Sequence, residues 1–330
     1  MKFKSIKLKI ATTLIVTILV ALVVTYYKSD KNQTLDSRVF MLKAEQIVRE
    51  QKPTPVQSSR FYAKVAKIYY DELVKSSDKN FTYDMSSSTA LELLDLIKKE
   101  DEQVVSNKKI GAEYWESNKS PFSPNADKLS RFILDERFDY KVPKPPAYNS
   151  QEFKDALNKV KEASENRTPE QGAAINFWGG VPGTEAPAGI WQNRLYVVTK
   201  KYNMTNVEYA YIQMVLAQSL ADSFLECWKV KYTYWTKRPD MVDASIITAM
   251  PNPPFPSYVS GHSTISWTAA TILSQFFPKE KDIFTKDADE AQNSRLWAGI
   301  HFPYDNEEGK NLGIKVGDYI VQKLDIKEIK

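Results

Sequence analysis

The chain has 330 residues, of which 42% are hydrophobic and 26% are charged, and its formal net charge is +4. This is the composition of an ordinary globular protein, and the length allows one large domain or two small ones. The positive charge is small and scattered, so we expect no nucleic-acid partner. The single cysteine, Cys227, excludes an intramolecular disulfide, and we interpret it as a small buried residue.

Residues 1–28 have the pattern of a targeting segment. Four lysines within the first nine residues precede an uncharged, mostly aliphatic run from Ile10 to Tyr27. This length lies at the boundary between a signal-peptide core and a short membrane span. Because no good cleavage site follows, we favour an uncleaved signal anchor over a cleaved signal peptide. Either segment would place the rest of the chain outside the cytoplasm, in the periplasm or at the cell surface.

The remaining chain divides into a short linker and one helical domain. Residues 29–52 are polar, and we expect a tether there. Residues 53–330 form the predicted domain, with a helical N-terminal part over 53–204 and a catalytic core over 205–330. No stretch shows sustained alternation of apolar and polar residues, so we predict an all-α, multi-helix bundle.

Two helices are predicted in the N-terminal part. Val56 to Leu73 has apolar residues at helical spacing. Thr89 and Glu92 have the spacing of a capping box at the start of a second helix. The glycines and prolines between Trp178 and Gly189 predict an irregular loop.

Four helices are predicted in the core. A capping box at Thr205 opens the strongest apolar pattern in the chain, which we expect to end near Trp228. Further helices are expected after His262, before His301, and over residues 306–324. The oligomeric state cannot be read from these patterns.

The core also contains the only two histidines of the sequence, His262 and His301, among residues suited to anion binding. Lys231 and Arg238 are separated by six residues, and a turn could bring both cations to one oxyanion. Taken alone, this pair would more often be a solvated basic loop.

Ser260, Gly261 and His262 follow a proline-rich stretch at the predicted start of a helix. The serine hydroxyl, the glycine amide and the helix N-terminus would favour an anion. The alternative is an N-cap serine followed by an incidental histidine.

Arg295, His301 and Asp305 form the third cluster. Asp305 lies close enough in sequence to orient the His301 ring and leave one ring nitrogen as an uncharged nucleophile. Asp305 would also suit a capping box with Glu308.

Together, the three clusters resemble the ordered motifs of the type 2 phosphatidic acid phosphatase and vanadium-dependent haloperoxidase superfamily, and the chain looks most like its soluble bacterial branch. The resemblance covers roughly residue 50 to the end, and Val259 stands where the family often has proline. It implies that five groups hold the equatorial oxygens of phosphate or vanadate: Lys231, Arg238, Ser260, Gly261 and Arg295. It also implies that His301 is the nucleophile of a phosphatase or the axial vanadium ligand of a haloperoxidase, and that His262 is the general acid–base.

The motifs do not separate the two reactions. Trp228 and Phe255 resemble, by their spacing to Lys231 and His262, the residues that line a halide pocket, although both also suit an ordinary core. On this basis we predict a haloperoxidase that uses vanadate, halide and peroxide. The alternative is an acid phosphatase without a cofactor, which hydrolyses phosphomonoesters through a phosphohistidine intermediate. A non-catalytic exported phosphate binder is a third hypothesis.

Overall fold

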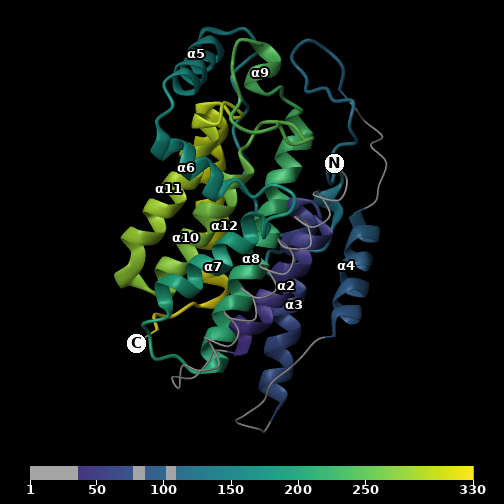
Figure 1. Ribbon diagram of the computed structural model, residues 1–330, viewed down its shortest axis with the longest axis vertical. Helices are drawn as coiled ribbons and strands as arrows, with labels where there is room; N and C mark the ends of the chain where they lie inside the picture. Colours follow the sequence, from purple (N-terminus) through teal and green to yellow (C-terminus); the bar gives the residue numbers. More distant parts are fainter. Residues whose placement is uncertain (1–35, 77–85, 102–108, 330) are drawn as a thin grey trace, which may run out of the picture.

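The computed structural model describes residues 36–76, 86–101 and 109–329 (Figure 1). Within these ranges the regular elements are helices, apart from two isolated β-bridges. The predicted all-α bundle is therefore confirmed. The signal anchor or signal peptide predicted over residues 1–28 lies outside the described residues. Among the described residues, no helix has the length and hydropathy needed to cross a membrane.

Helices α2 (Asp36–Gln51) and α3 (Pro55–Lys75) pack against each other. Phe40 and Val48 of α2 are buried in the core, so this segment forms a helix where we expected a polar tether. The expectation was wrong because the polar outer face of an amphipathic helix dominates its average composition. Helix α3 confirms the helix predicted over residues 56–73.

Helix α4 (Ser87–Asp101) begins slightly earlier than its capping pattern predicts. The Ser86 hydroxyl accepts a hydrogen bond from the Thr89 backbone N–H at 3.2 Å. Ser86 therefore performs the capping that we assigned to Thr89, because either side chain lies within one turn of the helix start.

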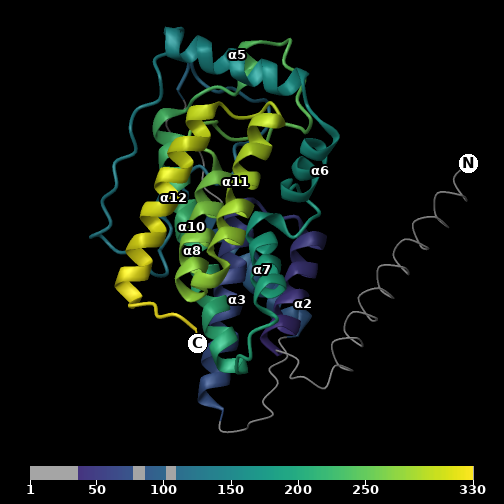
Figure 2. The ribbon, with the colours of Figure 1, turned by 90° about the vertical axis from the view of Figure 1, so that its left-hand side faces the viewer.

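The middle of the chain contains three helices that the apolar pattern did not predict. These are α5 (Gln151–Glu165), α6 (Pro169–Trp178) and α7 (Ala186–Thr199). Figure 2 shows α5 lying across one end of the bundle. Residues 179–185 connect α6 to α7 and form the irregular loop predicted between Trp178 and Gly189. The predicted loop was too long at its C-terminal end, because α7 already begins at Ala186, with Pro187 in its first turn.

Helix α8 (Asn206–Tyr234) crosses the core and starts at the predicted Thr205 capping box. It continues past Trp228, where we expected it to end, and stops at Trp235, whose φ of 61° is left-handed. Lys231 therefore lies in the last turn of α8 rather than in the segment after it. A helical backbone fixes the direction of this side chain more firmly than a loop would.

The remaining elements are the short helix α9 (Pro239–Val242) and the helices α10 (Gly261–Phe276), α11 (Lys281–Trp297) and α12 (Pro303–Leu324). They confirm the three helices predicted around the two histidines. Two short 3₁₀ segments complete the described elements, at Ala126–Lys128 and Pro278–Glu280.

Helix α10 is central to the C-terminal part, because it packs against α8, α11 and α12 (Figures 1 and 2). The approach of α12 to α10 is very close at Gly313. A Cβ atom at this position would lie 2.2 Å from the Thr264 carbonyl oxygen. The missing side chain therefore lets the two helices approach, which brings their N-termini, and the two histidines, to the same end of the bundle.

Candidate active site

The site forms where the N-terminus of α10 meets the segment that precedes α12. Ser260 is the N-cap of α10, and its hydroxyl accepts a hydrogen bond from Ser263 N–H at 3.4 Å. The Ser260 backbone N–H donates to the Asp305 carbonyl oxygen at 2.8 Å. This bond joins the Ser260–Gly261–His262 motif directly to the first turn of α12.

Three buried cations converge around these N-termini. Lys231 comes from the last turn of α8, Arg238 from the segment before α9, and Arg295 from the last turn of α11. Each side chain is at most 1% exposed. Burying a charge is costly without a compensating opposite charge, so this group favours a bound anion.

Lys231 is held by the proline-rich segment. Its Nζ donates to the Pro256 carbonyl at 3.0 Å and to the Ser257 carbonyl at 2.7 Å. Burial lowers the pKa of Lys231 to about 7, and Arg238 acts in the same direction. A nearby anion would restore the charge of this ammonium group.

Arg238 is anchored through only part of its guanidinium. Nε donates to the Phe255 carbonyl at 3.2 Å, and Nη1 donates to the Ile300 carbonyl at 2.8 Å. Nη2 has no hydrogen-bond partner among the described residues, although it is buried. Burial lowers the pKa of Arg238 to about 10, so the group stays charged at neutral pH. A buried, charged donor without a protein partner is suited to bind an anion.

Arg295 is oriented from helix α6 and its own helix. Its Nε lies 3.1 Å from the Ser294 hydroxyl, and its Nη2 lies 3.4 Å from the Ile175 carbonyl oxygen. Nη1 contacts the Met250 sulfur at 3.1 Å. Burial lowers the pKa of Arg295 to about 9, with Arg238 contributing.

His301 contacts the one carboxylate that touches the site in the described chain. His301 Nδ1 lies 2.9 Å from Asp305 Oδ2, which also accepts hydrogen bonds from the Ser257 hydroxyl and, at 3.0 Å, from the Phe302 N–H. A proton on Nδ1 leaves the lone pair on Nε2, which lies 3.4 Å from Arg238 Nη1.

The charges of this pair follow from their surroundings. Burial raises the pKa of Asp305 to about 6, against the hydrogen bond from Ser257. Burial, together with Arg238, lowers the pKa of His301 well below its usual value. At neutral pH the pair therefore consists of a carboxylate and a neutral imidazole. Asp305 is also the third residue of α12 and bonds the Phe302 backbone, so it orients the histidine and caps the helix.

His262 receives its orientation from a residue that the sequence did not indicate. Its Nε2 lies 2.8 Å from the Trp178 carbonyl oxygen at the end of α6. A carbonyl only accepts, so Nε2 carries the proton and Nδ1 has the lone pair. Burial and Arg295 lower the pKa of His262 well below its usual value, so this ring is also neutral.

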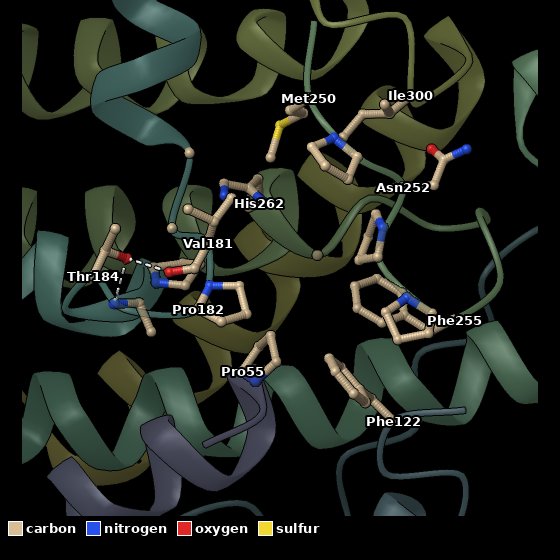
Figure 3. Close-up of a pocket in the computed structure, with 18 of the residues that line it drawn as sticks. Pro55, Phe122, Val181, Pro182, Thr184, Met250, Asn252, Phe255, His262 and Ile300 are labelled. Carbon is tan, nitrogen blue, oxygen red and sulfur yellow. Dashed lines mark hydrogen bonds between the residues drawn. The ribbon is translucent and has the colours of Figure 1, made fainter. Parts of the chain in front are cut away.

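A cavity of about 610 Å³ opens above these groups (Figure 3). Six predicted site residues line it, namely Trp228, Phe255, Gly261, His262, Arg295 and His301. The other four are not in its lining: Lys231, Arg238, Ser260 and Asp305. They are fully buried, and the first two lie beneath the aromatic wall.

The two aromatic residues of the predicted halide pocket lie side by side. The ring centroids of Trp228 and Phe255 are 4.9 Å apart. Lys231 Nζ lies 5.7 Å from the first centroid and 5.1 Å from the second, and the Arg238 guanidinium carbon lies 5.1 Å from Phe255. These distances permit cation–π attraction, so the rings cover the cations from the cavity side.

Sequence reasoning missed Ser257 and the backbone carbonyls that hold the site. Ser257 lies outside the motif spacing, and carbonyl groups have no sequence signal because every residue carries one. The proline-rich stretch around Ser257 was the available hint, since an extended chain exposes its carbonyls to neighbours.

Comparisons with known proteins agree with this architecture. Residues 280–326, which contain Arg295, His301 and Asp305, match a family model described as the VCPO second helical-bundle domain. A search of curated proteins finds no match to the sequence.

Solved structures are similar over nearly the whole chain. The crystal structure of a bacterial vanadium-dependent iodoperoxidase matches with a TM-score of 0.71 and 21% identity, over 89% of this chain and 97% of the other. The apo form of a bacterial vanadium-dependent chloroperoxidase matches with a TM-score of 0.58 and 11% identity, over 90% and 94% of the two chains. A holo-type structure of a bacterial vanadium-dependent chloroperoxidase gives a TM-score of 0.56 and 10% identity, over 88% and 90% of the two chains. These neighbours are enzymes, in agreement with the expectation that this chain is one. The chain therefore has the fold of the type 2 phosphatidic acid phosphatase and vanadium-dependent haloperoxidase superfamily, as its three motifs predict.

Proposed function

We propose that the protein is a vanadate-dependent haloperoxidase that oxidises halide with peroxide at the site of His262 and His301. The observation that carries this proposal is the imbalance of buried charge. Lys231, Arg238 and Arg295 are buried, whereas Asp305 is the one carboxylate among the described residues that contacts the site, through His301. In addition, Arg238 Nη2 is a buried donor without a partner among the described residues. A tetrahedral or trigonal-bipyramidal oxyanion would compensate both deficits.

The residues fit vanadate by their chemistry. Lys231, Arg238 and Arg295 would supply positive charge to its oxygens, and Ser260 and the Gly261 amide would donate hydrogen bonds. The unprotonated Nε2 of His301 would bind the vanadium, because Asp305 keeps the proton on Nδ1. Bound vanadate supplies Lewis-acid activation of peroxide at neutral pH.

His262 would hold and transfer the proton of the reaction. The Trp178 carbonyl fixes the proton on Nε2, so Nδ1 is the free base. The lowered pKa keeps this base available in neutral solution. Trp228 and Phe255 would form the apolar side of a halide site, since both rings line the cavity directly over buried positive charge.

An acid phosphatase is the second candidate, and the volume of the cavity supports it. The same cations would hold a phosphoryl group, His301 Nε2 would attack phosphorus, and His262 would protonate the leaving alcohol. A cavity of about 610 Å³ has room for that alcohol. This reaction would require no cofactor.

Export remains part of the proposal through residues 1–28, which would act as a signal anchor or signal peptide. The mass of the mature N-terminus distinguishes these two cases. Residues 53–330 would form the exported enzyme domain, and α2 would belong to it as well, because α2 packs against α3.

Two assays on the same preparation test the function. One follows bromination or iodination of a phenol dye with vanadate and peroxide, and the other follows hydrolysis of p-nitrophenyl phosphate. Turnover with halide supports the haloperoxidase, and turnover with the phosphoester alone would reject it. Tight phosphate binding without either turnover would identify a binding protein.

A further inference from the structure

The cavity is far larger than the inorganic substrates require. Its volume is about 610 Å³, whereas halide and peroxide are close in size to a water molecule, which occupies roughly 30 Å³. Cavities of roughly 300–1,000 Å³ are typical of sites that enclose organic molecules. Halide and peroxide therefore fill only a small part of this space.

The walls are suited to an apolar body. Prolines from three separate segments line the cavity, within residues 53–55, 182–187 and 251–254, together with Phe122 and Met250 (Figure 3). Proline rings present C–H surface without an N–H donor, and they pack well against aromatic rings. Because proline also restricts the backbone, the wall is formed before a ligand enters.

The charges of the lining all have one sign. No Asp or Glu occurs among the described lining residues, whereas Lys52, Lys119 and Arg295 do. Neither lysine ammonium group has a hydrogen-bond or ionic partner among the described residues. The Lys52 stem passes Gly183, with Cε 3.7 Å from the position of a Cβ there.

These charged lining residues differ in exposure. Lys52, Lys119 and Val181 are exposed, whereas Arg295, Gly261 and His301 are buried. An entering molecule therefore meets exposed positive charge on the two lysines and buried positive charge on Arg295, within a mostly apolar wall. This arrangement attracts anions and retains those that have an apolar body.

We propose that the cavity binds an aromatic organic anion carrying one carboxylate or phenolate group, and that this anion is the acceptor of the oxidised halogen. The second part rests on the proposed haloperoxidase function. In the step, a ring carbon forms a bond to the halogen of hypohalous acid while the halogen–oxygen bond breaks. The ring proton and the released hydroxide form water, so the reaction is ArH + HOX → ArX + H₂O.

Binding is tested without turnover by two probes that differ in one charge. The anionic probe is 8-anilinonaphthalene-1-sulfonate, and the neutral probe is N-phenyl-1-naphthylamine, which has the same rings. Titration of each into the purified full chain, followed by fluorescence, should give at least fivefold tighter binding of the anion. Equal affinities would overturn the proposal.

The lysines are tested by the double variant Lys52→Met/Lys119→Met, which keeps the apolar stems. Each exposed charge contributes modestly, so we expect the anion to bind roughly 3- to 10-fold more weakly and the neutral probe to bind as before. Lys75→Met is the matched control, because Lys75 is exposed at the opposite end of α3 from Pro55. A double variant that binds the anion as the control does would contradict the assignment.

The acceptor role is tested with 4-hydroxyphenylacetate and its neutral methyl ester. Halogenation should saturate with the acid, and the double variant should raise its KM roughly 3- to 10-fold. Equal, unsaturable rates for acid and ester would show halogenation in free solution and reject the acceptor role. Binding of the anionic probe without any halide oxidation would instead reject the haloperoxidase function and leave the binding site standing.

Discussion

His301 Nδ1 lies 2.9 Å from Asp305 Oδ2, and this contact determines which ring nitrogen faces the rest of the site. The carboxylate accepts the Nδ1 proton, so Nε2 keeps its lone pair beside Arg238. The proposed roles of His301, as vanadium ligand or as nucleophile, both require this tautomer.

Asp305→Asn should therefore weaken vanadate binding by about 10- to 100-fold, the usual cost of removing the partner of a ligating histidine. Isothermal titration with orthovanadate measures this affinity. Asp318→Asn, an exposed position on the same helix, is the control and should bind as the wild type does. If the two variants have the same affinity, Asp305 does not orient the ligand.

Ser257→Ala should move the acidic limb of the pH–activity profile upward. The Ser257 hydroxyl donates to Asp305 and lowers the pKa of that carboxyl, which burial has raised to about 6. Removal of one hydrogen bond, worth about 1 kcal/mol, should raise this pKa by roughly half to one unit. Activity would then be lost at a higher pH as the pH falls.

The control for this shift is Ser245→Ala. Ser245 donates a hydrogen bond to the partly exposed Asp243 at 2.7 Å, away from the cavity lining. Its profile should coincide with that of the wild type. An unchanged acidic limb in Ser257→Ala would show that Asp305 protonation does not limit activity.

The stability of the ligand-free protein should rise with pH between about 7 and 9 because of Lys231. Its folded pKa of about 7 lies below the ordinary value of 10.5, so the unfolded chain binds more protons in this range. The contribution of Lys231 to the free energy of unfolding is complete above pH 10.5, the ordinary pKa of lysine, and is lost as the pH falls toward 7. Arg238 and Arg295 titrate at about 10 and about 9, above most of this window.

Urea denaturation at a series of pH values measures this slope, which should amount to on the order of 1–3 kcal/mol across the window. Lys231→Met should remove most of the slope, and the exposed Lys75→Met should keep it. Saturating phosphate should also flatten it, because a bound anion restores the Lys231 charge. A wild-type slope that survives in Lys231→Met would contradict the low pKa.

His262→Ala should separate turnover from anion binding. His262 contacts the Trp178 carbonyl and lines the cavity, while the three buried cations hold the anion. Loss of a general acid–base should lower kcat by about 100- to 10,000-fold. Vanadate affinity should change far less, and a parallel loss of both would mean that His262 mainly binds the anion.

Much of the C-terminal fold could be predicted from sequence because its signals are local. The Thr205 capping box and the motif spacing around His262 and His301 identify α8, α10 and α12 correctly. The end of α8 was predicted too early. Trp228 and Lys231 are residues of the proposed site, and neither residue type ends a helix. The actual end depends on Trp235 taking a left-handed conformation, which its residue type does not predict.

Other features depend on contacts between distant segments. Gly313 has a low helix propensity, which in the sequence alone suggests a less stable helix. In the structure it permits the close approach of α12 to α10. Trp178 orients His262 through a backbone carbonyl across 84 positions of sequence. The cavity combines segments near residues 53, 122, 182 and 252, and no single segment predicts it.

One titration tests the oxyanion assignment together with its chemistry. Orthovanadate is added to the full chain and to Arg238→Lys, which keeps the charge but removes the unpartnered Nη2, and halide oxidation by peroxide is followed at each point. We predict that wild-type activity is absent without vanadate and saturates at one equivalent, and that Arg238→Lys requires at least tenfold more vanadate. Activity that is independent of vanadate, or identical titration curves for the two proteins, would contradict the proposed site.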